Sequence, residues 1–173
     1  MKAGTKSVLW GVHAFWFHPI VVGLAWHKIH NRWPNRWEWI AIATHDLGYV
    51  GCSELDGPDG KLHPYVGARI GKSIARFFGA REYEALHVEE LVLGHSRSFC
   101  DAECKKLSDL CDPDKLSVLY DPAIFYWLRG TLSDEFQEYW HREEQRHYVT
   151  IKSSWEWLRG YRRAIKARFS KRT

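Results

Sequence analysis

Four histidines and two aspartates lie where their side chains could hold a metal ion together: His18, His45, Asp46, His63, His95 and Asp114. Helical counting places each histidine on the apolar stripe of its segment, so each should point toward the core, whereas His27 and His87 fall off these stripes. A single inward histidine is usually a core residue that hydrogen-bonds to the backbone. Four unrelated ones would use core positions poorly, and imidazole and carboxylate groups on facing helices are how a bundle builds a metal site.

Asp46 is the most informative of the six. It follows His45 at the end of the apolar segment WEWIAIATHDLGY, where burial removes hydration and the C-terminal end of a helix dipole repels an anion. A positive charge must compensate, and either a metal ion or an arginine would serve. Asp114 alone carries little weight, because acidic residues favour the first turn of a helix for dipole reasons.

Helical periodicity dominates the chain, and we expect an all-α fold, a single-domain helical bundle over residues 1–173. A Gly-, Asp- and Pro-rich loop should cover 51–61, and 97–111 has no clear pattern. Asp112-Pro113 and Asp121-Pro122 are typical helix starts, each with an aspartate cap before proline. The expected helices are 15–31, 35–48, 63–78 and 81–96, with one or two long amphipathic helices from Ser133 onward.

Aromatic and basic residues are unevenly distributed. Six of the ten tryptophans precede residue 40, which favours a core filled with large side chains over a surface that stacks on bases. Seven basic residues and no acidic one lie between Arg159 and the last residue. Such a tail can hold phosphate or anionic lipid, but it is more often a solvated helix end. The net charge of +4 is too small to imply nucleic-acid binding by itself.

The cysteines and the apolar runs bear on the compartment. None of the four cysteines forms a CxxC pair, so a structural zinc site is not expected. His13 and His18 interrupt the first apolar run, which fits neither a secretory signal nor a membrane span. We expect a cytoplasmic protein with reduced thiols and no membrane partner. The sequence leaves a homo-oligomer open.

The order His, His-Asp, Asp resembles the HD superfamily of metal-dependent phosphohydrolases, and the resemblance covers about residues 13–125. It implies a first metal on His18, His45, Asp46 and Asp114. In the family's two-metal members Asp46 would bridge to a second metal held by His63 and His95. Such sites suit Mn, Fe, Co, Ni or Zn, and Mg less well. The segments that carry the resemblance are HPIVVGLAW (18–26), ATHDLGY (43–49), HPYVGARI (63–70), LGHSRSF (93–99) and PDKLSVL (113–119).

One position departs from the family pattern. Some nucleotidase members have a glutamate three residues after the His-Asp aspartate, where this chain has Tyr49. An acidic residue of the following loop could substitute, and the candidates are Glu54, Asp56 and Asp59. Asp46 is the preferred residue to orient or deprotonate the attacking water and is the expected catalytic residue.

The resemblance implies hydrolysis of a phosphate ester or anhydride, with a nucleotide or deoxynucleotide as the favoured substrate. Lys61 and Arg97 flank ligand histidines and could clamp phosphates, and surface charge is the alternative interpretation. Aromatic residues near the ligands could stack on a base, and these are Trp16, Trp26 and Tyr49. Two alternatives stay open: a phosphodiesterase of a cyclic or oligomeric nucleotide, and a non-catalytic nucleic-acid-binding or regulatory module.

Overall fold

The computed structural model describes residues 1–139 and 153–170. The regular structure in these residues is helical and contains no strand, which confirms the all-α prediction. Residues 135–139 are also helical. The named elements are α1 (Ala3–Trp10), α2 (His18–His30), α3 (Arg36–Thr44), the 3-10 helix η1 (Leu47–Tyr49), α4 (Pro58–Lys61), α5 (His63–Phe77), α6 (Glu82–Leu93), α7 (Arg97–Ala102), α8 (Cys111–Ser117), α9 (Ala123–Leu132) and α11 (Ser154–Ser170).

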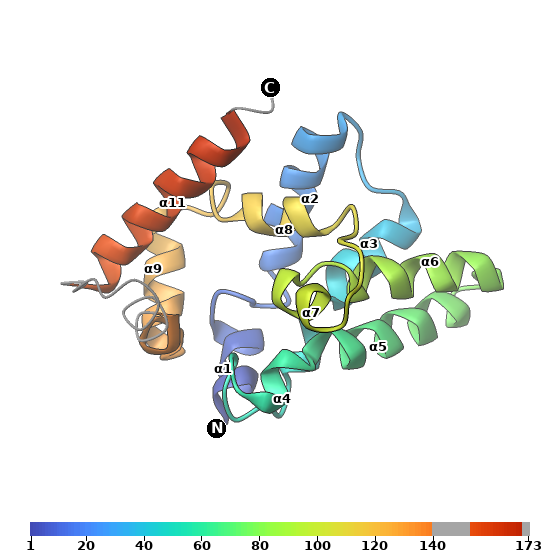
Figure 1. The fold of residues 1–173 in the computed structure, drawn as a ribbon, viewed down its shortest axis with the longest axis horizontal. Coiled ribbons are helices and arrows are strands. Elements are labelled where there is room, and N and C mark those ends of the chain that lie inside the picture. Colours follow the sequence, from blue (N-terminus) through green and yellow to red (C-terminus); the bar gives the residue numbers. More distant parts are fainter. Residues whose placement is uncertain (140–152, 171–173) are drawn as a thin grey trace.

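The larger core lies between α2, α3, α5 and α6. Helices α5 and α6 form a hairpin and run side by side along their length (Figure 1). Trp26 of α2 and Ile42 of α3 are fully buried against Val88 of α6 and small residues of α5 such as Ala68. Burial of such apolar side chains supplies most of the stabilisation of a helix pair in water.

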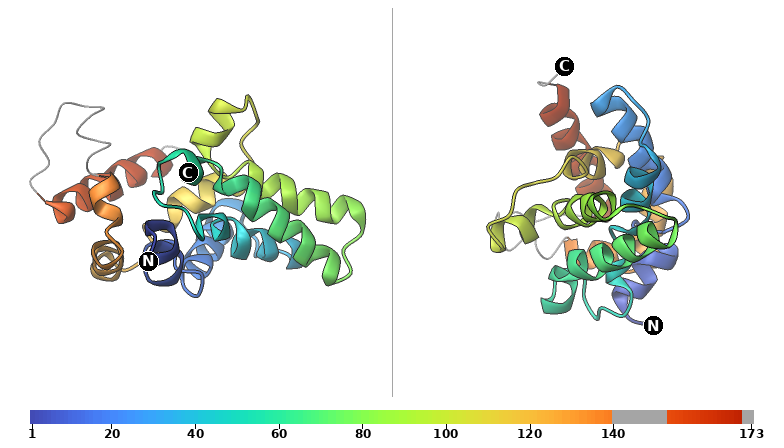
Figure 2. Two further views of the ribbon diagram at one scale, coloured as in Figure 1. Left: turned by 90° about the horizontal axis from the view of Figure 1, so that it is seen from below. Right: turned by 90° about the vertical axis from the view of Figure 1, so that its right-hand side faces the viewer.

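A second core cluster joins α11 to the rest of the molecule. Leu158 and Ile165 of α11 pack with Leu116 of α8, Val118 and Ala25 of α2. Helices α9 and α11 therefore stand on the opposite side of α8 from the α5–α6 hairpin (Figures 1 and 2).

Two glycines, Gly67 of α5 and Gly48 of η1, let the segment at the end of α3 approach α5 closely. A Cβ atom on Gly67 would lie 2.7 Å from the carbonyl oxygen of His45 and 2.8 Å from that of Thr44. Gly48 of η1 faces the start of α5, and a Cβ atom on it would lie 2.0 Å from the carbonyl oxygen of His63. No side chain larger than hydrogen fits at either position without a backbone shift.

The expected helix 35–48 is wrong at its C-terminal end. It begins as predicted, with an Asn35–Glu38 capping box, but α3 ends at Thr44 and His45 is its C-cap. Asp46 precedes η1 and lies outside the α-helix. Close packing of this segment against α5 at Gly48 accompanies the change from α-helix to the tighter 3-10 turn.

Other boundaries also differ from the predictions. The expected helix 81–96 ends at Leu93, because Gly94 caps it where the backbone of Ser108 packs closely. Helix α8 begins at Cys111, so Asp112 lies inside the first turn and pairs with Arg168 at 2.9 Å instead of capping. Likewise Pro122, not Asp121, is the N-cap of α9. Helices α1, α4 and α7 lie in segments where no helix was predicted.

The basic C-terminal helix is only partly a solvated surface. The guanidinium of Arg162 donates hydrogen bonds to the carbonyl oxygens of Val118, Leu119 and Asp121, which follow α8. Arg159, Arg163 and Lys166 are exposed. Lys171 and Arg172 lie outside the described residues, as does much of the predicted helical region after 139.

Among the residues that the structure covers, no helix combines the length and the apolar character needed to cross a bilayer.

Candidate metal centre

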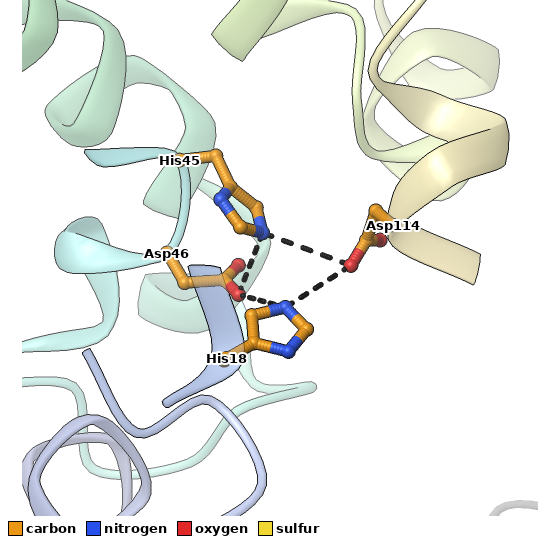
Figure 3. Close-up of side chains that lie close together, drawn as sticks. All are labelled: His18, His45, Asp46 and Asp114. Atoms are coloured by element: carbon orange, nitrogen blue, oxygen red, sulfur yellow. Dashed lines mark ion pairs between the residues drawn. The ribbon is translucent and has the colours of Figure 1, made fainter. Parts of the chain in front are cut away.

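Four of the predicted ligands meet in one buried cluster, drawn in Figure 3. His18 begins α2, His45 caps α3, Asp46 follows it, and Asp114 lies in the first turn of α8. The Nε2 atom of His18 lies 3.3 Å from Asp46 Oδ2 and 3.3 Å from Asp114 Oδ1. His45 Nε2 lies 2.9 Å and 3.7 Å from the same two oxygens.

The remaining ligands meet on the other side of Asp46. The Nε2 atoms of His63 and His95 lie 3.7 Å and 3.6 Å from Asp46 Oδ1. One oxygen of Asp46 thus faces His18 and His45, and the other faces His63 and His95. All six predicted ligands come together in two groups that could each hold a metal ion, with Asp46 common to both.

Backbone hydrogen bonds fix the tautomer of three histidines. In each of them Nδ1 lies 2.5–2.7 Å from the carbonyl oxygen three residues earlier in the chain. A carbonyl oxygen only accepts, so Nδ1 carries a proton, and in the neutral ring Nε2 is the acceptor that points into the cluster. Such bonds are the usual support of metal-binding histidines. The residues are His45 with Ile42, His63 with Gly60, and His95 with Val92.

The contact between His63 and His95 is hard to explain without a cation. Their Nε2 atoms lie 3.1 Å apart. Burial lowers the pKa of both imidazoles, most strongly that of His63, so both rings are neutral. With both protons on Nδ1, two lone pairs face each other. A shared metal ion would turn this repulsion into coordination.

Buried polar atoms without partners give a second argument for the fit. Among the described residues, His18 Nε2, His45 Nε2 and Asp46 Oδ2 are buried and have no hydrogen bond of acceptable geometry. Unsatisfied buried groups are costly and rare, and they often mark an ion site. Three of them converge here, so the donor set fits a divalent transition metal.

The charges of the cluster are consistent with cation binding. Burial favours the neutral acid, but His45 and the other histidines hold the pKa of Asp46 well below its usual range. Lys115, 2.8 Å from Asp114 Oδ2, does the same for the pKa of Asp114. Burial alone would lower the pKa of His45, yet Asp46 and Asp114 raise it to about 10. Two buried carboxylates therefore stay ionised and attract a cation.

The two groups open into one cavity of about 370 Å³. Among its lining residues are His13, Tyr49, Arg97, Lys115 and four aromatic residues from the C-terminal part of the chain. The volume lies within the range of small-molecule sites. The centre is thus accessible to a ligand.

Of the two residues predicted to bind substrate phosphates, one lies at the cavity. Arg97 lines it, but Lys61 is exposed and does not. Lys115 is the other cation at the cavity, and its interaction with Asp114 raises its pKa further. Of the acidic loop residues, Asp56 lines the cavity, whereas Glu54 and Asp59 do not.

The aromatic predictions were mostly wrong. Tyr49 lines the cavity and stacks on His63, with ring centroids 3.8 Å apart. Trp26 is buried in the larger core. Trp16 is half exposed and bonds to the carbonyl oxygen of Leu9. His27, expected to be a weak candidate, is exposed and stacks on Trp33.

A buried histidine–glutamate pair beside the ligands was missed by sequence reasoning. His13 lines the cavity, packs edge-on against His18, and lies 3.2 Å from Glu135 Oε2. Burial works to lower the pKa of His13, but the charges of Asp46 and Glu135 outweigh it and raise this pKa. Glu135 also accepts bonds from Ser133 and from the backbone of Val12. No local pattern signals a pair 122 residues apart in the chain.

Comparisons of the chain with family models, with curated proteins and with solved structures find no match.

Proposed function

We propose that this protein is a metal-dependent phosphohydrolase of the HD type that acts on a nucleotide or deoxynucleotide. The observation that carries the proposal is the convergence of the other five predicted ligands on Asp46. Backbone bonds at Nδ1 leave the Nε2 atoms of His45, His63 and His95 facing the cluster, and His18 Nε2 and His45 Nε2 have no hydrogen-bond partner. A divalent Mn, Fe, Co, Ni or Zn ion, or less favourably Mg, would lower the pKa of a bound water and neutralise phosphoryl charge. The shared carboxylate of Asp46 favours two ions over one.

The chain's own residues have distinct parts in this proposal. Asp46 would orient the attacking water and accept its proton, because one of its oxygens faces each group. Lys115 and Arg97 line the cavity beside the ligands and would hold phosphoryl oxygens. We place the reaction in the cytoplasm, in keeping with four free cysteines.

The cavity volume favours a single nucleotide unit over an oligomeric substrate and leaves a cyclic nucleotide as the phosphodiesterase alternative. Aromatic side chains of the C-terminal helices line a space of about 370 Å³, which suits one nucleotide unit better than an oligomer. Product analysis distinguishes the two, since a monoesterase releases inorganic phosphate and a phosphodiesterase leaves the phosphate on a nucleotide.

The test is elemental analysis and a nucleotide screen on the wild type, Asp46→Asn and the control Asp101→Asn. Asp101 lines the cavity but belongs to neither ligand group. We expect metal content near one or two ions and phosphate release in the wild type and the control, and loss of both in Asp46→Asn. Absence of metal under every loading condition would overturn the proposal. Salt-sensitive oligonucleotide binding without turnover would then favour a non-catalytic module.

A further inference from the structure

Four aromatic side chains from the C-terminal part of the chain form one wall of the cavity, here called the aromatic wall: Tyr126, Tyr139, Trp157 and Tyr161. The ring of Trp157 stacks between the rings of Tyr139 and Tyr161. Its centroid lies 5.5 Å from that of Tyr139, at 21°, and 5.2 Å from that of Tyr161, at 16°. Three nearly parallel rings thus stand beside the cavity.

The aromatic wall is not simply core. The buried residues of α11 in the second core cluster are aliphatic, Leu158 at 0% exposure and Ile165 at 7%, and three wall residues (Tyr126, Trp157 and Tyr161) pack against this cluster from the cavity side. The four wall residues are only partly buried and contribute surface to the cavity. Aromatic rings that line a hydrated cavity next to ionic groups are typical of ligand sites, because they bury a planar apolar surface at low entropic cost.

The wall is held in place by its own neighbours. The hydroxyl of Tyr139 donates to Glu135 Oε2 at 3.2 Å, and Glu135 is fixed by its bonds to Ser133 and to the backbone of Val12. Leu158, beside Trp157 in α11, anchors the helix in the core. Rigid support of this kind is what a selective binding surface requires.

The other side of the cavity is ionic. It carries the two ligand groups with Lys115 and Arg97, and the hydroxyls of Ser96 and Ser98 lie 3.3 Å apart there. A ligand that matches both sides has a phosphate at one end and a planar aromatic group at the other. Nucleoside monophosphates have this chemistry.

We propose that the aromatic wall binds the base of a nucleoside monophosphate by ring contact and selects substrates that carry a base. This rests on the proposed function for the chemistry at the phosphate, but base binding itself does not need turnover. Because bases of every kind have a π-face, the wall accepts both purines and pyrimidines.

The first test compares the Mn-loaded wild type, Trp157→Leu, Trp157→Phe and the control Trp155→Leu. Trp155 lies on the same helix, packs edge-on against Trp127 and does not line the cavity. The readout is the ratio of kcat/KM for the four common nucleoside 5′-monophosphates to that for ribose 5-phosphate, which lacks a base. We expect Trp157→Leu to lower this ratio about 5- to 150-fold, the range for loss of an aromatic contact with a base, because it removes the central ring that holds Tyr139 and Tyr161 in line. Trp157→Phe should keep most of it. An unchanged ratio in Trp157→Leu, or an equal fall in Trp155→Leu, would overturn the proposal.

A second measurement separates failure of this proposal from failure of the proposed function. If none of the proteins hydrolyses either phosphate ester, calorimetric binding of the same nucleoside monophosphates and of ribose 5-phosphate decides. Nucleotide binding that weakens in Trp157→Leu and persists in Trp157→Phe and Trp155→Leu would support the wall without an enzyme. Nucleotide binding that is equal in all four proteins, or no tighter than that of ribose 5-phosphate, would refute it. Circular dichroism checks that each variant is folded.

Discussion

Replacement of Gly67 by alanine tests the close contact that sets the two ligand groups beside each other. In a helix interior alanine is more favourable than glycine by about 0.8–1 kcal/mol. Here the new Cβ atom would lie 2.7 Å from the carbonyl oxygen of His45 and 2.8 Å from that of Thr44. Both are backbone atoms, so no side chain can turn aside. Ordinary contact requires α5 to retreat from α3 by about 0.7 Å.

Gly160→Ala is the matched control, because Gly160 lies within α11 and a Cβ atom there meets nothing within 4 Å. The gain in helix propensity is the same in both variants and cancels in the comparison. Overpacking costs about 1–3 kcal/mol, so Gly67→Ala should be less stable than Gly160→Ala by that amount. For a chain of this size the difference in Tm is about 2–12 °C.

Thermal and urea unfolding measure this difference, and elemental analysis shows its effect on the site. Movement of α5 carries His63 away from Asp46, and a site loosened by more than about 0.5 Å loses affinity. We expect Gly67→Ala to retain fewer metal ions than Gly160→Ala under the same loading. Equal stability and equal metal content in the two variants would refute the argument that glycine is required for this contact.

Three further predictions follow from the packing and the charges. Mn²⁺ at about 100 times its Kd should raise the free energy of unfolding of the wild type by about 2.7 kcal/mol, which corresponds to a rise in Tm of about 5–11 °C. A thermal scan should show that Asp114→Asn loses most of this rise. Burial alone would raise the pKa of Glu38, but its bonds to Arg32 and the Asn35 N–H hold this pKa below the ordinary value. Glu38→Gln should therefore cost about 1–2 kcal/mol in urea unfolding at pH 7. The gap should narrow steadily as the pH falls below the ordinary pKa of a glutamate, about 4.3, and a gap that stays constant or widens with acid would contradict this. Leu158→Ala, at a fully buried position of α11, should cost about 2–5 kcal/mol while unfolding stays a single transition; a separate transition would show that α11 folds apart from the ligand helices.

The residues of the two candidate metal groups could be predicted because the orientation of their side chains is decided locally. Val21, Val22 and Ala25 mark the inward face of the helix that begins at His18, and a period of 3.6 residues extends this face to the histidine. The same reasoning applies to His63 and the other ligand histidines. Whether these inward faces meet is a tertiary question, and the structure answers it by bringing all six ligands together.

The features that sequence reasoning missed depend on long-range packing. Nothing near His13 indicates that Glu135 will hold it, since the two meet only after α9 has packed against α1. The position of Trp157 at the cavity depends on how α11 lies on α8. Proximity to the predicted ligands in the sequence suggested Trp16 and Trp26 as residues that stack on a base, but Trp26 is needed for the core. The end of α3 at Thr44 was missed because a close helix–helix approach, not a local breaker, ends it.

The ionic side of the cavity and the aromatic wall are synthesised at different times. The last residue of the candidate metal groups is Asp114, whereas the aromatic wall is complete only at Tyr161. At 5–20 residues per second this interval lasts roughly 2–9 s. The residues that we propose as metal ligands are therefore made before the surface that we propose for base recognition. Because α11 is expected to unfold together with the helices that carry these residues, the two proposed sites should reach their folded form in one step.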